Sequence, residues 1–210
     1  MNYTQIIDMA LNFADREYHT KIIDRMDNFL RMVESRINRK IKQEGLTARA
    51  TITTVADQEY YGLPADFSSL IDIEIKASVI ATVRQTLIYR TPAKLNDYAN
   101  VAETNDAVYY TLINNQLQII QPQDGRTIEI VYHMKVPELT SVDDENDVSI
   151  NDPDCYIAGL LVEINSFVKD ANAASIWDTR FKEILGEMDF NDFKRKYNGA
   201  QLEIVSEDSI

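Results

Sequence analysis

Side chains suited to nucleophilic catalysis are scarce in this sequence. It contains two histidines, His19 and His133, and one cysteine, Cys155. Neither histidine is adjacent to a serine or cysteine or follows an Asp-x-His pattern, so no catalytic triad is predicted. We expect solvent or capping roles for both histidines. Cys155 comes just after the start of an expected helix, where a thiol pKa can fall, but packing as a small core residue is the better interpretation.

The acidic segment 141–150 is the strongest candidate for metal binding. Oxygen-bearing side chains recur with the spacing of a calcium loop, at Asp143, Glu145, Asp147, Ser149, Asn151 and Asp154. However, Val148 stands where such a loop needs glycine, and Asp154 is shorter than the usual bidentate glutamate. We therefore interpret the segment as a solvated loop, with a calcium-dependent binding or hydrolytic module as an alternative. Since phosphate-loop, HExxH and paired-cysteine motifs are also missing, we expect no metal, no cofactor and no enzymatic activity.

The charge balance argues against sequence-specific reading of nucleic acid. The 210 residues contain 21 Lys and Arg against 34 Asp and Glu, a net charge of −13, whereas DNA readers need surplus cations. The net charge is +1 over 1–45, −4 over 46–140 and −10 over 141–210. Basic residues cluster once, at Arg36, Arg39, Lys40 and Lys42. This cluster complements the dipole at a helix C-terminus, and contact with an acidic partner is the alternative.

Length and hydropathy indicate one ordinary domain, or one domain with an appendage. A single cysteine cannot form an internal disulfide, so the protein does not need an oxidising compartment in order to fold. The N-terminal residues lack the pattern of a signal peptide, and the most apolar window, 70–83, is interrupted by charges. We expect a soluble protein that is neither exported nor inserted in a membrane.

Helical periodicity marks both ends of the chain. Apolar residues at three-and-four spacing predict a short helix with Thr4 as its N-cap and a long helix over 20–44 that stops at Gly45. Near the C-terminus, Asp152 and Pro153 indicate the N-cap and first position of another helix, and a further helix ends near 197.

The middle of the chain alternates with a period of two, which predicts strands at 48–55, 70–75, 108–113, 116–120 and 127–132. Asn114 and Asn115 predict a two-residue hairpin turn, and the last three strands are expected to form a meander. A short helix is expected over 91–98, while 78–89 fits a helix or a strand equally well. The prediction is an α+β fold: a discontinuous helical bundle (1–46 and 151–199), an inserted small antiparallel β lobe (47–140), an acidic loop (141–150) and a tail (200–210).

The segment Tyr60-Tyr61-Gly62-Leu63-Pro64-Ala65-Asp66-Phe67 resembles the Tyr-x-Leu-Pro-x-Asp-Phe element of head-to-tail adaptor (connector, or neck) proteins of tailed bacteriophages, similar to the tail tubular protein A of short-tailed phages. In it, Leu-Pro is expected to stop a strand and Asp66 to cap the following turn. Further matches follow in the family's order: Arg36-Ile37-Asn38, Tyr109-Tyr110, Leu117 to Pro122, Ile128 to Tyr132, and the aromatic final helix with Trp177 and Phe181. The resemblance spans residues 5 to 197.

This resemblance implies a non-enzymatic virion protein of the neck, assembled in the host cytoplasm. Such adaptors form twelve-subunit rings between the portal protein and the tail or nozzle, and DNA passes through their channel without specific binding. The C-terminal segments reach the portal, and the corresponding candidate here is Leu202-Glu203-Ile204-Val205. The β lobe would face the tail, and acidic surface would line the channel and let DNA slide. A generic oligomeric scaffold without portal affinity is the alternative.

Overall fold

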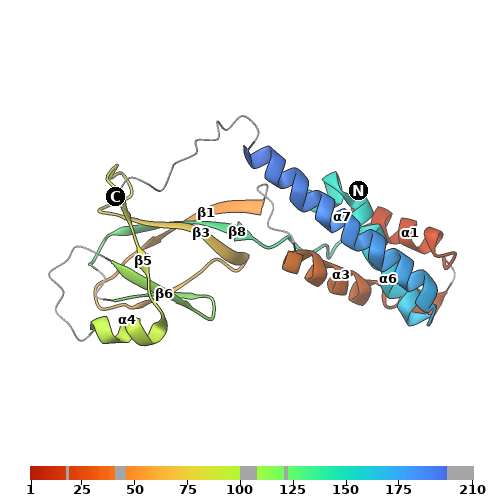
Figure 1. The fold of residues 1–210 in the computed structure, drawn as a ribbon, viewed down its shortest axis with the longest axis horizontal. Helices are drawn as coiled ribbons and strands as arrows, with labels where there is room; N and C mark the ends of the chain where they lie inside the picture. The colour runs from red at the N-terminus through yellow and green to blue at the C-terminus, as the bar shows by residue number, and fades with distance from the viewer. Residues whose placement is uncertain (18, 41–45, 100–107, 121–122, 198–210) are drawn as a thin grey trace, which may run out of the picture. The chain divides into compact units, whose positions relative to one another are not determined.

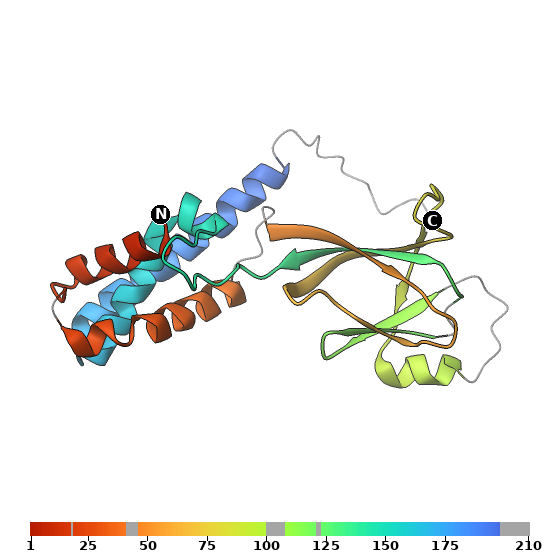
Figure 2. The ribbon, with the colours of Figure 1, turned by 180° about the vertical axis from the view of Figure 1, so that it is seen from behind.

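The computed structural model describes residues 1–17, 19–40, 46–99, 108–120 and 123–197, and the fold is α+β, as the sequence predicts. Contacts divide the chain into two compact units. The helical unit comprises Met1–Gly45 and Glu138–Ile210, and the β unit comprises Leu46–Pro137. Figures 1 and 2 show the helices of the first unit and the strands of the second. Within the described residues, no helix is long and apolar enough to cross a lipid bilayer.

The helical unit is organised around one buried helix. Its helices are α1 (Tyr3–Phe13), α2 (Thr20–Ile23), α3 (Met26–Lys40), α5 (Asp147–Asn151), α6 (Pro153–Phe167) and α7 (Ala171–Tyr197). Helices α1, α3 and α7 all pack against α6, and α6 and α7 lie side by side (Figure 1). Residues around the whole circumference of α6 are buried, from Cys155 to Ile164. The apolar stripes of the other helices are therefore buried against a shared centre.

Three expectations for the helical unit are wrong in detail. Asn2, not Thr4, is the N-cap of α1: its side chain accepts a hydrogen bond from the Gln5 amide, and Gln5 closes a capping box. The helix expected over 20–44 is broken between Ile23 and Met26, giving α2 and α3, and Gly45 lies outside the described residues. The expected acidic loop contains α5, capped by Asn146.

Among its described residues, the β unit contains two four-stranded sheets. Its strands are β1 (Thr47–Thr53), β2 (Tyr60–Gly62), β3 (Phe67–Lys76), β4 (Gln85–Thr86), β5 (Ile88–Tyr89), β6 (Tyr109–Ile113), β7 (Gln116–Ile119) and β8 (Thr127–Met134). The strand orders are β1-β8-β3-β4 and β2-β7-β6-β5. Apolar side chains from both sheets form one core, which includes Tyr61, Ile73, Leu117, Ile128 and Ile130. Helix α4 (Pro92–Ala99) packs beside β6.

The hairpin prediction is confirmed, but the meander is not. Asn114 and Asn115 have φ angles of 44° and 62°, as a two-residue turn between β6 and β7 requires. Strand β8, however, pairs with β1 and β3 in the other sheet, and β7 pairs with β2 instead. The lobe is also not purely antiparallel, since β5 and β6 are parallel. The ambiguous segment 78–89 forms neither a helix nor a long strand, only β4 and β5.

Candidate assembly surfaces

A glycine allows the helices of the helical unit to approach closely. Gly159 lies on α6, and a Cβ atom there would come 2.6 Å from Val33 Cγ1 on α3 and 3.2 Å from the Phe181 ring on α7. The distance to Val33 is shorter than real Cβ contacts and the distance to Phe181 is tighter than most, so a larger residue at this position would force its neighbours to shift. The small size of this residue therefore fixes how α3 and α7 sit against α6.

Arg36 joins the same three helices through its charge. Its guanidinium pairs with Asp178 on α7, lies 3.5 Å from Glu163 on α6, and stacks 4.7 Å from the centre of the Phe181 ring. Hydrogen bonds from Lys182 and Arg36 hold the pKa of the Asp178 carboxyl below its usual range. Planar stacking combined with two carboxylates suits arginine and not lysine. Arg36 is thus committed to contacts within its own chain.

The other members of the predicted basic cluster lie at the end of α3. Arg39 is exposed, and its Nε donates to the Ser35 carbonyl oxygen at 3.2 Å. Lys40 is exposed at the last residue of the helix, and Lys42 lies outside the described residues. The structure brings Arg39 and Lys40 together at a helix C-terminus, where cations complement the dipole. Their contact with an acidic partner stays a prediction.

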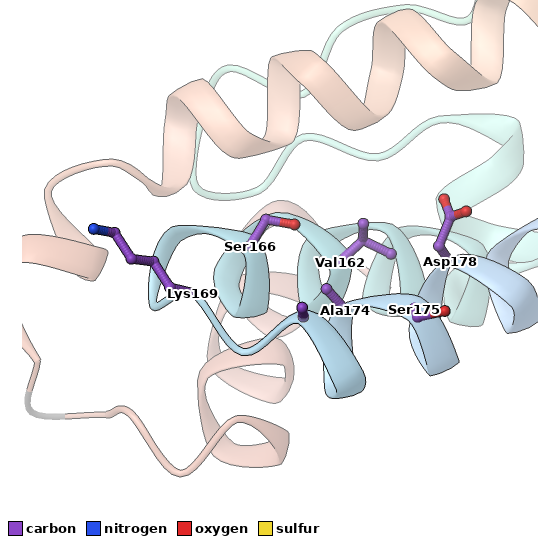
Figure 3. A pocket seen from close by; sticks show the side chains of 7 residues that line it. Val162, Ser166, Lys169, Ala174, Ser175 and Asp178 are labelled. Atoms are coloured by element: carbon purple, nitrogen blue, oxygen red, sulfur yellow. The ribbon is translucent and has the colours of Figure 1, made fainter.

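An open groove of about 540 Å³ runs along α6 and α7. Val162 and Ser166 of α6, Lys169 in the connecting turn, and Ala171, Ala174, Ser175 and Asp178 of α7 line it. Figure 3 shows these side chains along the two helices, with Lys169 at the turn. Lys169 has a φ of 65°, the left-handed conformation that ends α6. Most of the lining residues are small or apolar. The sequence shows the spacing of these residues, but it does not show that they lie on an exposed face of α7.

A buried carboxyl holds the returning chain against α3. The Glu34 side chain is only 3% exposed, and its Oε1 accepts a hydrogen bond from the Leu139 amide at 2.8 Å. Burial raises the pKa of Glu34 to about 7, the Leu139 amide and Arg31 oppose this rise, and Glu138 adds to it. Sequence reasoning missed this residue, because periodicity alone placed a charged side chain at a helical position without showing its burial.

The acidic segment forms turns and a helix start. Oδ2 of Asp144 accepts hydrogen bonds from the Thr140 and Ser141 amides, both at 2.8 Å, and these bonds lower its pKa. Asn146 and Ser149 form a capping box at the start of α5. Among the described residues, no group of His, Cys, Asp or Glu side chains is arranged to hold a metal ion. The Asp144 carboxylate thus stabilises the local turn.

The residues considered for catalysis are far from a catalytic arrangement. Cys155 is fully buried in α6, and burial raises the pKa of its thiol. His19 is the exposed N-cap residue of α2 and makes no capping bond with its side chain. His133 lies in β8 opposite Ser69, but Ser69 Oγ has no hydrogen-bond partner within the described structure. A charged thiolate or an activated serine is therefore not prepared at these positions.

The Tyr60–Phe67 element forms a corner of the β unit. The Tyr61 hydroxyl donates to the Val55 carbonyl and accepts from the Val55 amide, at 3.2 and 3.0 Å. Strand β2 ends at Gly62, and the Phe67 amide closes a turn onto the Pro64 carbonyl. Asp66 does not cap this turn: its carboxylate accepts from the Tyr132 hydroxyl at 3.1 Å. The element that resembles the adaptor family is therefore a structural anchor between β2, β3 and β8.

The segment Leu202-Glu203-Ile204-Val205, predicted to contact the portal, lies outside the described residues. A comparison with curated proteins finds no match. A comparison with protein families finds a match to the SU10 adaptor protein over residues 1–203, which is nearly the whole chain. The match covers both units, together with the Tyr60–Phe67 corner. The chain therefore belongs to the SU10 adaptor protein family and is a structural adaptor of a bacteriophage virion.

Proposed function

We propose that this chain is a head-to-tail adaptor that forms a ring, of twelve copies by analogy with similar adaptors, between the portal protein and the tail or nozzle. The observation that carries the proposal is the family match over residues 1–203. In this role the ring is assembled in the host cytoplasm, lies in the virion neck, and continues the DNA channel. The protein acts as a structural connector and needs no cofactor.

A rigid helical unit supports this role. Gly159 and the Arg36 contacts fix α3, α6 and α7 relative to one another, so the surface of this unit is preorganised for association. Preorganised surfaces lose little conformational entropy when they bind. A subunit that must repeat around a ring benefits from such a fixed geometry, because small angular errors accumulate at each contact.

The β unit carries an exposed apolar turn between β3 and β4. Val79, Ile80 and Val83 are 71%, 91% and 81% exposed in the segment between β3 and β4. Valine and isoleucine are poor choices for a solvated turn, where Gly, Asn, Asp, Pro and Ser dominate. Apolar side chains that cluster on an exposed turn indicate a surface that binds another protein. We assign this turn to the contact with the tail protein.

The distribution of charge supports passage of DNA without binding. The last third of the sequence, 141–210, carries a net charge of −10. Negative walls repel phosphates, so a channel lined by this part of the chain would let a duplex slide. The portal contact is assigned to Leu202-Glu203-Ile204-Val205, which has the apolar and β-branched composition of a segment that adds a strand to a sheet edge.

Deletion of residues 200–210 tests the portal assignment. The truncated protein should keep its helical circular dichroism and its unfolding transition but co-sediment less with portal rings from the same phage. Unchanged co-sedimentation would refute the assignment. A pull-down of the full chain separates an adaptor from a scaffold, since a scaffold would not retain the portal. Titration with calcium in a calorimeter tests the third alternative, a calcium-dependent module. Such a module would release or absorb heat on binding calcium, whereas an adaptor or a scaffold would not.

A further inference from the structure

The groove on α6 and α7 has the side chains that let another helix approach closely. Ala171, Ala174, Ser175 and Asp178 follow the i, i+3, i+4, i+7 spacing along one face of α7. Small residues on such a face let two helices pack with a short distance between their axes, near the lower end of the usual range of about 8 to 10 Å. The Val162 side chain, 7% exposed, forms the apolar floor. The groove therefore fits an amphipathic helix with two or three large apolar side chains.

Helix α1 presents such a face to solvent. Ile6, Ala10 and Leu11 are buried inside the helical unit, whereas Met9 and Phe13 are 39% and 63% exposed. Together with Gln5, Asp8 and Asn12, they line a shallow depression of about 530 Å³. Methionine and phenylalanine are enriched in the cores of protein interfaces. The outer face of α1 is thus an apolar stripe, spaced i and i+4, with Asp8 beside it.

The two surfaces cannot meet within one chain. Asp178, in the lining of the groove, pairs with Arg36 of α3, so the groove opens on the flank of α7 that faces α3. Helix α1 lies on another flank of α7, where the Phe13 ring contacts the Trp177 ring at 6.5 Å between centroids. Packing of Ile6 and Ala10 also holds α1 in place. An occupant of the groove must come from a second molecule.

Charge favours a second copy as that molecule. Asp8 on the stripe is exposed, Lys169 is exposed at the end of the groove, and neither side chain has an ion pair among the described residues. The two residues carry opposite charges on surfaces of matching apolar character. A contact between two different faces of identical subunits is head-to-tail, and such contacts repeat until a ring closes.

We propose that α1 of one copy packs into the α6–α7 groove of the next copy, with Met9 and Phe13 on the small residues of α7 and Asp8 paired with Lys169. This inference rests on the ring of the proposed function and names its subunit contact. Rim charges mainly set register and association rate, while the apolar anchors supply most of the affinity.

Charge reversal tests the pairing. The full chain is assembled alone and its rings are counted by mass photometry as a function of concentration. Asp8→Lys and Lys169→Asp each place like charges opposite one another, so each should raise the midpoint concentration for assembly by about threefold to tenfold, and the double variant, which again pairs opposite charges, should restore it. Lys169 can be replaced by aspartate because aspartate tolerates positive φ. Asp97→Lys, an exposed reversal in α4 of the β unit, is the matched control and should change nothing.

Blocked variants test the head-to-tail geometry. Ser175→Phe fills the groove and Met9→Asp removes an apolar anchor without touching the Phe13–Trp177 ring contact; each alone should stay monomeric with wild-type helicity. Mixed together, they keep one intact pair of surfaces and should form dimers and nothing larger. Rings that form normally from every variant would overturn this inference while leaving the proposed function standing. Failure of the wild-type chain to form rings, alone or on portals, would instead contradict the proposed function.

Discussion

Glu34 makes the stability of the helical unit depend on pH in a direction opposite to that of most paired carboxylates. In the unfolded chain its carboxyl titrates near 4.5, whereas in the folded unit burial raises its pKa to about 7. At a pH between these two pKa values, Glu34 carries a proton in the folded state more often than in the unfolded state. The free energy of unfolding should therefore fall as pH rises from about 4.5 to 7, and this contribution is constant above 7.

The size of the effect follows from the gap between the two pKa values. One pKa unit corresponds to about 1.4 kcal/mol, so complete ionisation of Glu34 costs the folded helical unit about 3 kcal/mol. Replacing Glu34 by glutamine removes the titration but keeps an oxygen that can accept from the Leu139 amide. The variant should equal the wild type near pH 4.5 and exceed its stability by about 3 kcal/mol at pH 8.

Urea denaturation followed by tryptophan fluorescence measures this difference. Trp177 is the single tryptophan and lies on α7, in the same unit as Glu34. Glu145→Gln, at an exposed position of the same unit, is the control and should follow the wild-type pH profile. If Glu34→Gln and the wild type differed by the same free energy at pH 5 and pH 8, the carboxyl would not titrate as its burial requires.

Three further substitutions test the packing, the corner and the first cap. Gly159→Ala should destabilise the helical unit by about 1 to 3 kcal/mol, because its methyl group meets Val33, and adding Val33→Ala should recover part of the loss in the same urea assay. Tyr61→Phe removes both hydrogen bonds between the Tyr61 hydroxyl and the Val55 backbone and should cost the β unit about 1 kcal/mol, measured by calorimetry; an unchanged transition would show that the corner is dispensable. Asn2→Ala should cost about 1 kcal/mol in helical stability, whereas Asn2→Asp, which preserves the acceptor, should cost little; equal losses would argue against the capping box.

Local sequence patterns predicted where helices, strands and turns occur better than they predicted which of these elements contact one another. The three-and-four spacing around Val33 and Ile37 identified an amphipathic helix, and Asn114-Asn115 identified the hairpin, because both signals lie within a few residues. The meander failed because the partners of β8 are β1 and β3, more than fifty residues earlier in the sequence. The choice of Asn2 over Thr4 as N-cap also depends on distant residues, since Thr4 Oγ1 and its amide bond to the Val142 carbonyl instead.

The candidate surfaces could be predicted only in part. The small residues Ala171, Ala174 and Ser175 are visible in the sequence, but they mark a groove only once the buried face of α7 is known to include Phe181 and Leu185 instead. Arg36 was recognised as part of a basic cluster, yet its partners Glu163 and Asp178 lie more than 120 residues away. Resemblance to adaptors rested on several short motifs in order, and the first of them, Tyr60–Phe67, has side chains that build a structural corner.

Electron microscopy of the purified chain, alone and mixed with portal rings of the same phage, tests the central claim most directly. A head-to-tail adaptor should form closed rings that stack coaxially on one face of the portal, with one adaptor subunit for each portal subunit, and the stacks should retain an open central channel. Monomers that leave the portal unchanged at saturating concentration would contradict the account.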